Sequence, residues 1–478
     1  MTTTLVRDPE RAGSGPATLS LAGLLTVLLG AGLSIIDFFI VNIALPTIDR
    51  TLDASPAMLE LVVAAYGIAY GVLLVLGGRL GDAFGRRRLF TAGLALFTLT
   101  SLFCGLAPTA GTLVVARAAQ GAAAALMVPQ VLSTIQATTT GERRSRAVGW
   151  YGATAGLSMI VGQLLGGVLV DADIAGLTWR PIFLVNVPIG LVALLIVRRT
   201  VPETRAVNPL GVDRTGTVLF GLLVLALLVP LMEGHSLGWP AWVWLLLGAV
   251  PFLAAAFVTA QRRAERAGSV PLVPPSVVGM PSMRRGLLLG APFFVGFGAF
   301  MFVYAVTLQD GLRVDALGAG LAITPMAVAF LAASLISSRL VARFGPLVVP
   351  AGAAVQLLGV GIMIVTTLTA WPELHIAQLA PGMAIAGFGQ GMAMTTVFRV
   401  VLSRVPAERA GVGSGILVTT QQVSLAAGVA TLGSLYLWLA EPGVLGTRNA
   451  FALVMLIQIL IATVIVIAGR KLPDPRVG

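Results

Sequence analysis

Two oppositely charged side chains lie inside long apolar runs of this sequence. Asp37 lies in the run from 17 to 46, and Arg117 lies in the run from 111 to 136. An ionised group in such surroundings is costly, so it must be paired, hydrated or, for a carboxyl group, protonated. Burial favours a neutral carboxyl group and a nearby cation favours the carboxylate. An aspartate that faces a water-filled cavity could therefore bind and release a proton, and we predict this chemistry at Asp37.

Both charged groups also have purely structural interpretations. A protonated Asp37 could simply bond a neighbouring helix, and Arg117 could form an ion pair that only holds helices together. In the functional interpretation, Arg117 biases the proton affinity of a carboxyl group or contacts an anionic part of a substrate. Asn42 and Gln120 lie in the same two runs and are candidates for the same site. The sequence leaves open whether Asp37 and Arg117 meet.

The composition predicts an all-α polytopic membrane protein. Hydrophobic residues make up 57% of the 478 residues, charged residues 11%, and the mean hydropathy is +0.95. A soluble protein would not tolerate such a surface. Fourteen apolar runs approach the ~20 residues that a membrane-spanning helix needs. They cover residues 17–46, 58–78, 88–107, 111–136, 147–170, 181–197, 215–232, 240–260, 286–308, 316–338, 347–369, 376–398, 413–439 and 450–469.

The basic residues predict the orientation in the membrane. The net charge of +11 could indicate a nucleic-acid partner, but most of the 31 Lys and Arg residues fall in loops on one side of the predicted spans. Because such loops stay cytoplasmic, we expect a cell-membrane protein with both termini, 1–16 and 471–478, inside the cell and no nucleic-acid partner. The first run is too long for a signal peptide and lacks a small-residue cleavage site.

Enzymatic and metal-binding motifs are missing from the sequence. Cys104 is the one cysteine, the two histidines lie in separate loops, and no phosphate-binding loop occurs. This pattern excludes a thiolate metal site and a nucleophilic dyad. We therefore expect no catalytic residues, no metal, no cofactor and no ATP drive.

Weak internal repeats predict a duplicated architecture. Three segments recur in order at nearly constant offset: Arg79–Gly85 and Arg339–Gly345, Gln120-Gly121 and Gln390-Gly391, and Arg146-Ala147 and Arg409-Ala410. They indicate two six-helix bundles, 17–200 and 284–470, separated by a linker, 201–283, with two additional helices. Parallel halves of this kind typically carry a substrate site between them near the middle of the membrane.

A polar, glycine-rich segment with three consecutive arginines lies between the second and third runs. Residues 77–88 read GGRLGDAFGRRR and predict a cytoplasmic turn. Asp82 could accept hydrogen bonds or face a helix N-terminus, while Arg86–Arg88 hold the turn at the headgroups. A pure orientation signal explains the arginines but leaves Asp82 unexplained.

These motifs resemble the fourteen-span drug:proton antiporters of the major facilitator superfamily over nearly the whole chain. The matching residues are Gly78–Arg87, Asp37 with Val41–Pro46, Arg117–Gly121, and Trp179–Gly190. The resemblance implies a gating loop that holds the halves together in one state, with Gly78, Asp82, Gly85, Arg86 and Arg87. It also implies an antiporter-motif helix with Gly156, Gly162, Gln163, Gly166 and Gly167.

Two positions depart from the pattern of that family. Gln163 replaces the proline of the motif in the fifth span, and Phe39 stands where a threonine is common. The first departure puts a proline kink and the antiport inference from that motif in doubt, and the glycines of this span are equally explained by close helix packing. The second departure could alter substrate contacts near Asp37.

The expected function is a proton-coupled secondary transporter that exports small amphipathic drugs, antibiotics or related metabolites as a monomer. The alternatives are a transporter of one specific metabolite in either direction and, less favoured, a channel or a membrane-embedded enzyme. The second half has no carboxylate deep in an apolar run, which disfavours dicationic substrates. Possible cavity-lining residues are Tyr66, Tyr70, Tyr304, Gln309, Gln390, Gln421 and Gln422.

Overall fold

The computed structural model describes residues 19–206, 211–234, 237–269, 271–405, 410–441 and 443–472. The predicted tail 1–16, Arg409 and residues 473–478 lie outside these ranges. The described residues form helices and no strand. In a membrane this is expected, because a helix satisfies its own backbone hydrogen bonds where water is absent.

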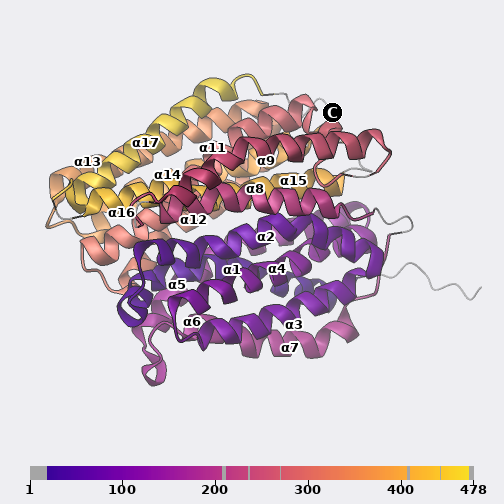
Figure 1. The fold of residues 1–478 in the computed structure, drawn as a ribbon, viewed down its shortest axis with the longest axis horizontal. Helices are drawn as coiled ribbons and strands as arrows, with labels where there is room; N and C mark the ends of the chain where they lie inside the picture. The colour runs from indigo at the N-terminus through magenta and orange to yellow at the C-terminus, as the bar shows by residue number, and fades with distance from the viewer. Residues whose placement is uncertain are drawn as a thin grey trace, which may run out of the picture.

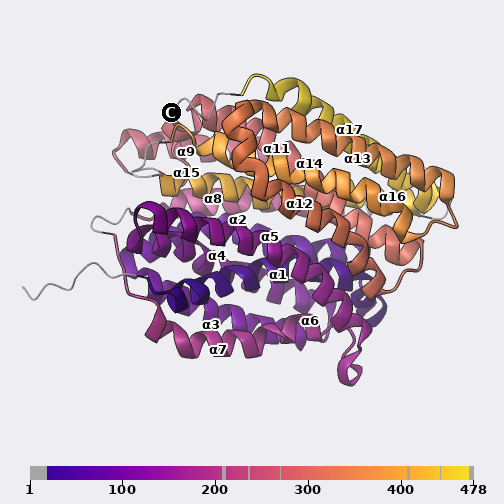
Figure 2. The ribbon, with the colours of Figure 1, turned by 180° about the vertical axis from the view of Figure 1, so that it is seen from behind.

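The helices form two layers that correspond to the two ends of the chain (Figures 1 and 2). The first layer contains α1 (Leu21–Leu52), α2 (Pro56–Phe84), α3 (Arg86–Gly105), α4 (Ala110–Thr138), α5 (Gly141–Asp171), α6 (Pro181–Leu184) and α7 (Asn186–Thr200). The second contains α11 (Pro281–Val306), η2 (Thr307–Gly311), α12 (Ala316–Phe344), α13 (Val348–Ala370), α14 (Ile376–Leu402), α15 (Ala410–Gly428), η5 (Val429–Gly433), α16 (Ser434–Ala440) and α17 (Gly446–Gly469). We call these layers the N half and the C half.

Two helices of the linker, α8 (Arg214–Glu233) and α9 (Ala241–Arg266), pack against each other. Helix α8 also contacts α2, α15 and η5, so the inserted pair lies along the boundary between the halves (Figure 1). The short elements η1 (Ile174–Gly176), α10 (Pro275–Val278) and η3 (Gly345–Leu347) complete the described chain.

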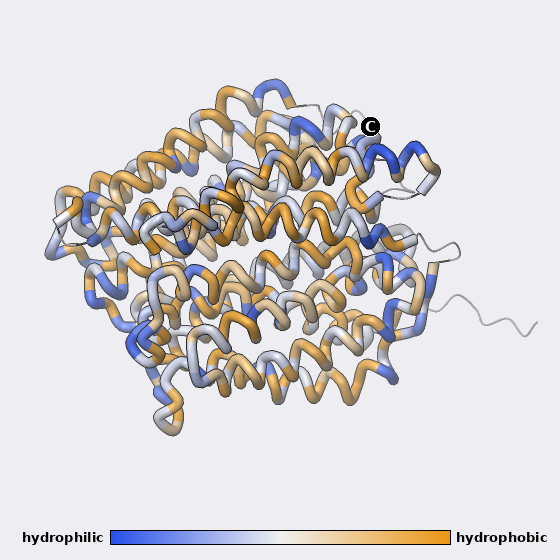
Figure 3. Tube along the Cα trace, viewed as in Figure 1, coloured by the Kyte–Doolittle hydropathy of each residue, from blue (hydrophilic) through white to orange (hydrophobic). Residues whose placement is uncertain are grey.

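The membrane fold predicted from composition is confirmed. Among the described residues, 13 helices are long and apolar enough to cross a membrane. The remaining predicted span is α5, a helix of 31 residues whose apolar part is Gly156–Asp171. Hydrophilic residues gather toward the ends of the helices (Figure 3). We call the end that carries Arg86–Arg88 the arginine-rich end, and the other the outer end.

The prediction of a turn over residues 77–88 is wrong for most of that segment. Helix α2 continues to Phe84 and α3 begins at Arg86, so only Gly85, with a φ of 112°, breaks the helix. The earlier glycines serve packing instead. A Cβ at Gly77 would collide with the carbonyl oxygen of Ala125, and one at Gly81 with the side chain of Gln130. They let α4 approach α2 closely, as small residues do in membranes.

The two halves use the repeated glycines in the same way. Gly121 of α4 lies against the backbone of Tyr66 in α2, and Gly391 of α14 lies against the backbone of Phe330 in α12. The helix pairs α2–α4 and α12–α14 are among the most extensive contacts in their halves. The sequence repeat therefore marks an equivalent helix crossing in each half.

Close packing in the C half gives a test with an internal control. A Cβ at Gly359 of α13 would collide with the backbone of Ala386 in α14, whereas one at Gly361 meets nothing within 4 Å. We expect Gly359→Ala to lower the free energy of unfolding by roughly 1–3 kcal/mol, since overpacking forces helices apart. Gly361→Ala should be neutral or slightly stabilising. Thermal unfolding of the purified protein in detergent measures both, and equal melting temperatures would contradict this packing.

Candidate functional site

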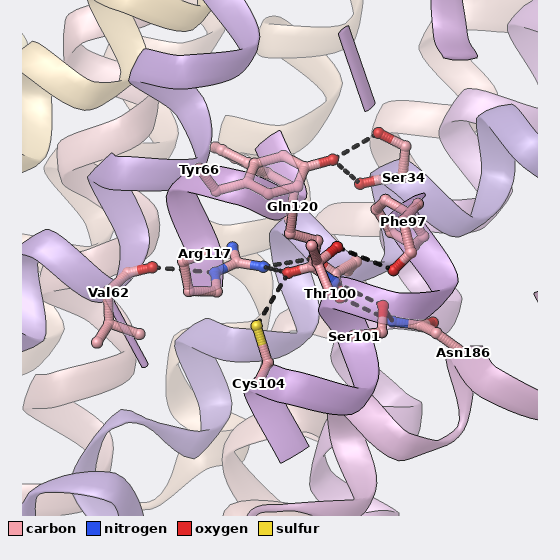
Figure 4. Close-up of polar contacts among 12 residues, drawn as sticks. Ser34, Val62, Tyr66, Phe97, Thr100, Ser101, Cys104, Arg117, Gln120 and Asn186 are labelled. Carbon is pink, nitrogen blue, oxygen red and sulfur yellow. Dashed lines mark hydrogen bonds and ion pairs between the residues drawn. The ribbon is translucent and has the colours of Figure 1, made fainter. Parts of the chain in front are cut away.

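Asp37 and Arg117 meet in a fully buried network inside the N half. Figure 4 shows Arg117, Gln120 and Asn186 converging in this network. The Nη1 atom of Arg117 donates to Oδ2 of Asp37 in an ion pair. The other carboxylate oxygen, Oδ1, accepts hydrogen bonds of 2.8 Å from Gln120 Nε2 and of 2.8 Å from Asn186 Nδ2. The carboxylate thus receives donors from α4 and α7 and joins three helices.

Arg117 is held by contacts on several sides. Its Nε donates to the carbonyl oxygen of Val62 in α2 at 3.1 Å, and its Nη1 also donates to Gln120 Oε1 at 2.7 Å. Its guanidinium carbon lies 4.5 Å from the ring centre of Tyr66 and 5.6 Å from that of Phe183. Such aromatic contacts favour a desolvated cation. Its Nη2 has no hydrogen-bond partner among the described residues.

An outer ring of polar atoms orients the site. Ser101 Oγ of α3 accepts from Gln120 Nε2 at 2.8 Å and from Asn186 Nδ2 at 3.3 Å. Cys104, the thiol that the sequence places alone in the third span, donates to Gln120 Oε1 at 3.5 Å. Gln120 is therefore fixed by partners on both its oxygen and its nitrogen.

The geometry of the carboxylate decides what chemistry it can perform. Asp37 is 0% exposed, and its charge is matched by Arg117, also 0% exposed. Each donor that points at the carboxylate stabilises its ionised form. Protonation removes the negative charge that these donors stabilise, so it would weaken the bonds from Arg117, Gln120 and Asn186. Proton binding at Asp37 would therefore loosen the contacts of α4 and α7 with α1.

Two members of this network were missed by sequence reasoning. Asn186 lies within the Trp179–Gly190 motif but was not among the predicted site residues, and Ser101 carried no signal beyond being a hydroxyl group in an apolar run. Asn42, by contrast, does not join the network. It donates to the carbonyl oxygen of Phe39 at 3.2 Å in its own helix and lines a small pocket between the halves.

A larger cavity of about 320 Å³ lies between the halves at the arginine-rich end. Of the seven predicted cavity-lining residues, Tyr70 lines it. The other walls come from α4, α5 and α15 and include Ser133, Tyr151 and Ser414. Gly78, Asp82 and Arg86 of the predicted gating loop also reach its surface. The cavity therefore connects the loop with both halves.

The other predicted cavity residues lie elsewhere. Tyr66 stacks on Arg117 and bonds Ser34 Oγ at 2.6 Å. Tyr304 is buried, and its hydroxyl group donates to the carbonyl oxygen of Ala322 at 3.4 Å. Three further glutamines are buried and line neither cavity: Gln309, Gln390 and Gln422. Gln421 is partly exposed on α15.

Gln390 is the repeat counterpart of Gln120, and the difference between them is informative. Gln120 bonds Asp37 and Arg117, whereas neither side-chain atom of Gln390 has a partner among the described residues. Among the described residues, the repeat position in the C half therefore carries no counterpart of the buried ion pair.

The glycines of α5 face two different neighbours. Gly162 and Gly166 lie against the backbone of α1, whereas Gly167 lies against Ala316 of α12 in the opposite half, and Gly156 lies near Leu331. At Gln163, where the resembled motif has a proline, α5 is helical. Its Nε2 lies 3.9 Å from the sulfur of Met301 in α11. Helix α5 thus forms part of the contact between the halves.

The gating-loop residues pair locally and with the segment after α7. Arg86 donates to Asp82 Oδ1 at 2.7 Å, and the backbone of Asp82 accepts from the amide of Ala206 at 3.1 Å. Glu203 lies 3.6 Å from Arg87 and 3.7 Å from Arg88. Glu203 was not predicted, since its place in the linker carries no sequence signal. The loop is therefore docked on the start of the linker.

Arg79 connects the same loop with both ends of the inserted helix pair. It donates to the carbonyl oxygens of Gly211, at 2.9 Å, and Pro271, at 2.5 Å. Its repeat counterpart Arg339 is exposed. The inserted pair therefore makes the two halves unequal at this end.

Asp213 holds the inserted pair together next to Arg79. Burial alone would raise the pKa of Asp213, but hydrogen bonds from the Gly216 amide, from Gln261 and from the Leu272 amide, together with the charge of Arg79, hold it below its ordinary value. The ionised carboxylate accepts from all three donors at 2.7 or 2.8 Å. Asp213 therefore joins the start of α8 to Gln261 of α9 and to the segment that follows α9.

Removal of this charge should weaken the fold in a pH-dependent way. Because the pKa of Asp213 is lowered on folding, its contribution to stability is present at neutral pH and is lost as the pH falls through the folded pKa. We expect Asp213→Asn to lower the melting temperature at neutral pH, and the difference from the wild type to shrink on acidification. The control is Asp315→Asn, which removes the carboxylate that caps α12 through the Gly318 amide. An equal, pH-independent loss in both variants would contradict this role.

Comparison with known proteins decides the family. A family model described as Major Facilitator Superfamily matches residues 27–429. The chain belongs to the major facilitator superfamily. It is therefore a multi-pass membrane transporter of small molecules and not an enzyme.

Relatives of this transporter include proteins named for antibiotics. It is 33% identical over 448 residues to the probable actinorhodin transporter of Streptomyces coelicolor, covering 92% of this chain and 76% of that protein. It is 36% identical over 431 residues to the puromycin resistance protein pur8 of Streptomyces alboniger, covering 88% of this chain and 83% of that protein. The cephamycin export protein CmcT of Amycolatopsis lactamdurans is 33% identical over 444 residues, covering 90% and 88%.

Solved structures support the same fold. A bacterial homologue of the human lysosomal transporter Spinster, in an inward-facing and occupied conformation, matches with a TM-score of 0.67 and 16% identity, covering 94% of this chain and 96% of that chain. A D-xylose-proton symporter matches with a TM-score of 0.65 and 16% identity, covering 95% and 98%. At this identity the likeness concerns the fold alone.

Proposed function

We propose that this transporter exports small amphipathic drugs, antibiotics or related metabolites in exchange for protons, by alternating access. Support for the substrate class comes from the names of its relatives, which concern actinorhodin, puromycin and cephamycin. The single observation that carries proton coupling is the Asp37 carboxylate, which is buried and bonded to Arg117, Gln120 and Asn186.

The proposed coupling follows from the geometry of this network. An ionised Asp37 holds α1, α4 and α7 together through its donors. Protonation removes the charge that attracts Arg117, so the ion pair opens and the helices can rearrange. A ligand can shift such an equilibrium only by binding the two states differently. The proton meets this condition, because the donors around Asp37 stabilise the ionised carboxylate more than the neutral acid.

The orientation in the membrane is part of the proposal. The arginine-rich end faces the cytoplasm of the cell, and both termini lie on that side. The cavity of about 320 Å³ then opens toward the cytoplasm, where an exported substrate enters. At the outer end the halves are in contact, because Gly167 of α5 lies against Ala316 of α12 and η5 packs on α2.

The predicted substrate charge follows from the unequal halves. Among the described residues of the C half, no carboxylate group is fully buried. The pocket between the halves is lined by apolar side chains such as Phe39, Phe297 and Met301. We therefore expect neutral or monocationic amphipathic compounds, handled by a monomer without cofactor or ATP.

Transport in proteoliposomes tests the proposal. The purified protein is reconstituted, a pH gradient is imposed, and dyes, antibiotics and small metabolites are offered in turn. We expect several amphipathic compounds to move against the direction of proton flow. Transport of one metabolite only would favour the specific transporter, and steady ohmic conductance would favour a channel.

A further inference from the structure

Glu60 is a buried carboxyl group at the contact between the two halves, near the outer end. It lies about one helical turn from the start of α2 and is 1% exposed. Ser434, the first residue of α16 in the C half, donates a hydrogen bond to Glu60 Oε2 at 2.6 Å. Glu60 was not among the predicted site residues. It lies near the start of the second apolar run, where the sequence alone does not indicate that a side chain is buried.

The surroundings of Glu60 are apolar and come from three parts of the chain. Next to it lies a cluster that we call the outer seam, formed by α2, α8 and α15–η5: Leu61, Ala64, Ile68, Val224, Leu228, Leu231, Met232, Ala426 and Ala430. Within the described part of the chain no arginine or lysine forms an ion pair with Glu60. One hydroxyl donor does not compensate a buried negative charge. These surroundings therefore suit a neutral carboxyl group better than a carboxylate.

The backbone next to Ser434 is itself irregular. Residues Val429–Gly433 form a π turn between α15 and α16, a feature that often marks functional positions. Ser434 Oγ also lies 2.9 Å from the carbonyl oxygen of Ala430 and 3.5 Å from that of Leu231 in α8. The hydroxyl group that meets Glu60 thus lies where the C half, the N half and the inserted pair come together.

Other ionisable groups on the elements around Glu60 do not neutralise it. The acid on α8, Glu233, adds negative charge. On α4, Arg117 is committed to Asp37, and on α16 the hydroxyl group of Tyr436 accepts a bond from Thr307. The outer end of α1 carries Asp49 and Arg50, and neither forms an ion pair with Glu60. Helix α3 carries its arginines at the far end, and α15 and η5 have no charged side chain.

We propose that Glu60 is a second proton-binding site, distinct from Asp37, whose bound proton keeps the outer seam closed. When the halves separate at the outer end, water reaches Glu60 and the carboxyl group ionises beside Glu233. Closure requires the proton to return. This inference rests on the proposed function for its alternating access and its orientation, in which the outer end faces the outside of the cell.

The two proton sites differ in where their protons go. Asp37 lies within the N half, whereas Glu60 lies at the outer contact between the halves, away from the cavity at the arginine-rich end. A proton on Glu60 therefore arrives from and returns to the same side. Glu60 senses the external pH and favours closure in acid, without adding to the number of protons exchanged per substrate.

A distance measurement between the outer ends of the halves tests this site. Spin labels are placed through Ile174→Cys in the N half and Val444→Cys in the C half, which are 50% and 41% exposed, while Cys104 is fully buried. The measurement uses Asp37→Asn protein, so that Asp37 cannot titrate. We expect the longer distance to gain population as the pH rises, with a change in the open-to-closed ratio of up to about tenfold per pH unit for one proton.

Glu60→Gln in the same protein mimics the protonated side chain. It should hold the shorter distance at every pH, whereas the control Glu233→Gln should keep the pH dependence. Ser434→Ala, which cannot donate to Glu60, should shift the population toward the longer distance. The proposal is overturned if the Glu60→Gln variant shows the same pH response as the Asp37→Asn protein that lacks it. It is also overturned if the distances in the Asp37→Asn protein do not change with pH.

The distance measurement distinguishes a failure of the Glu60 proposal from a failure of the proposed function. Proton-driven export that survives Asp37→Asn would remove Asp37 as the coupling site, but it would leave the Glu60 distances unaffected. Conversely, if the distances at the outer end do not change with pH while proton-driven export is intact, only the proposal for Glu60 is refuted. A misfolded Glu60→Gln protein is recognised by its elution in size-exclusion chromatography. In that case the distances measured in Ser434→Ala test the role of Glu60.

Discussion

Asp37→Asn should reach the membrane in normal amounts yet lose export driven by a pH gradient. Asparagine has nearly the shape of aspartate and can still accept one hydrogen bond from Gln120 or Asn186, but it cannot bind a proton. We expect substrate efflux from proteoliposomes to fall to the rate seen without a gradient. Counterflow exchange of substrate, which needs no proton, should continue.

The control for this variant lies on the same helix. Asp49 is near the outer end of α1, twelve residues from Asp37, and takes no part in the buried network. Asp49→Asn should therefore export at the wild-type rate with the same response to the gradient. Gradient-driven efflux in Asp37→Asn equal to that of Asp49→Asn would refute the coupling role.

Arg117→Met should be the most destabilising single change in the N half. It removes the cation from a buried ion pair and leaves the carboxylate of Asp37 without compensation. Loss of one partner of such a pair costs about 3–5 kcal/mol of unfolding free energy. The Val62 carbonyl oxygen also loses its donor and Tyr66 loses its cation. Thermal unfolding of the purified protein measures the loss.

A double variant separates charge from packing at this site. In Asp37→Asn with Arg117→Met neither charge remains, so much of the lost stability should return. Arg117→Lys keeps the charge, but a lysine cannot bond Val62, Asp37 and Gln120 at once as the planar guanidinium does. We therefore expect a stability between those of the wild type and Arg117→Met, and poor export. If the double variant melts no higher than Arg117→Met, uncompensated charge is not the cause of the instability.

Family membership and the membrane fold could be predicted because they depend on local properties. Apolar length predicts spans wherever they lie in the chain. The prediction of a turn over 77–88 was wrong for a related reason. Glycine and arginine signal a break when only neighbours in sequence are considered, whereas the contact of Gly77 with Ala125 of α4 shows that a glycine can serve a helix crossing.

The candidate site was predicted in part. Asp37, Arg117 and Gln120 were singled out as rare polar groups in apolar runs, and the structure brings these three together. Asn42 has the same appearance in the sequence but bonds its own helix. Asp37 and Asn42 are five residues apart, which places them about 140° apart around the axis of α1, and hydropathy does not show which of the two faces the buried network.

The sequence by itself determined that the chain spans a membrane and that it carries a rare acid and base, because each is a property of a short segment. The duplication showed itself only as weak echoes between distant segments. Only the tertiary structure decided which of these segments meet. Asp37 lies 80 residues from Arg117 and 149 from Asn186, and Glu60 lies 374 residues from Ser434. Such contacts depend on how whole helices pack. The physical reason is that burial gives a carboxyl group its chemistry, and burial is set by neighbours distant in sequence.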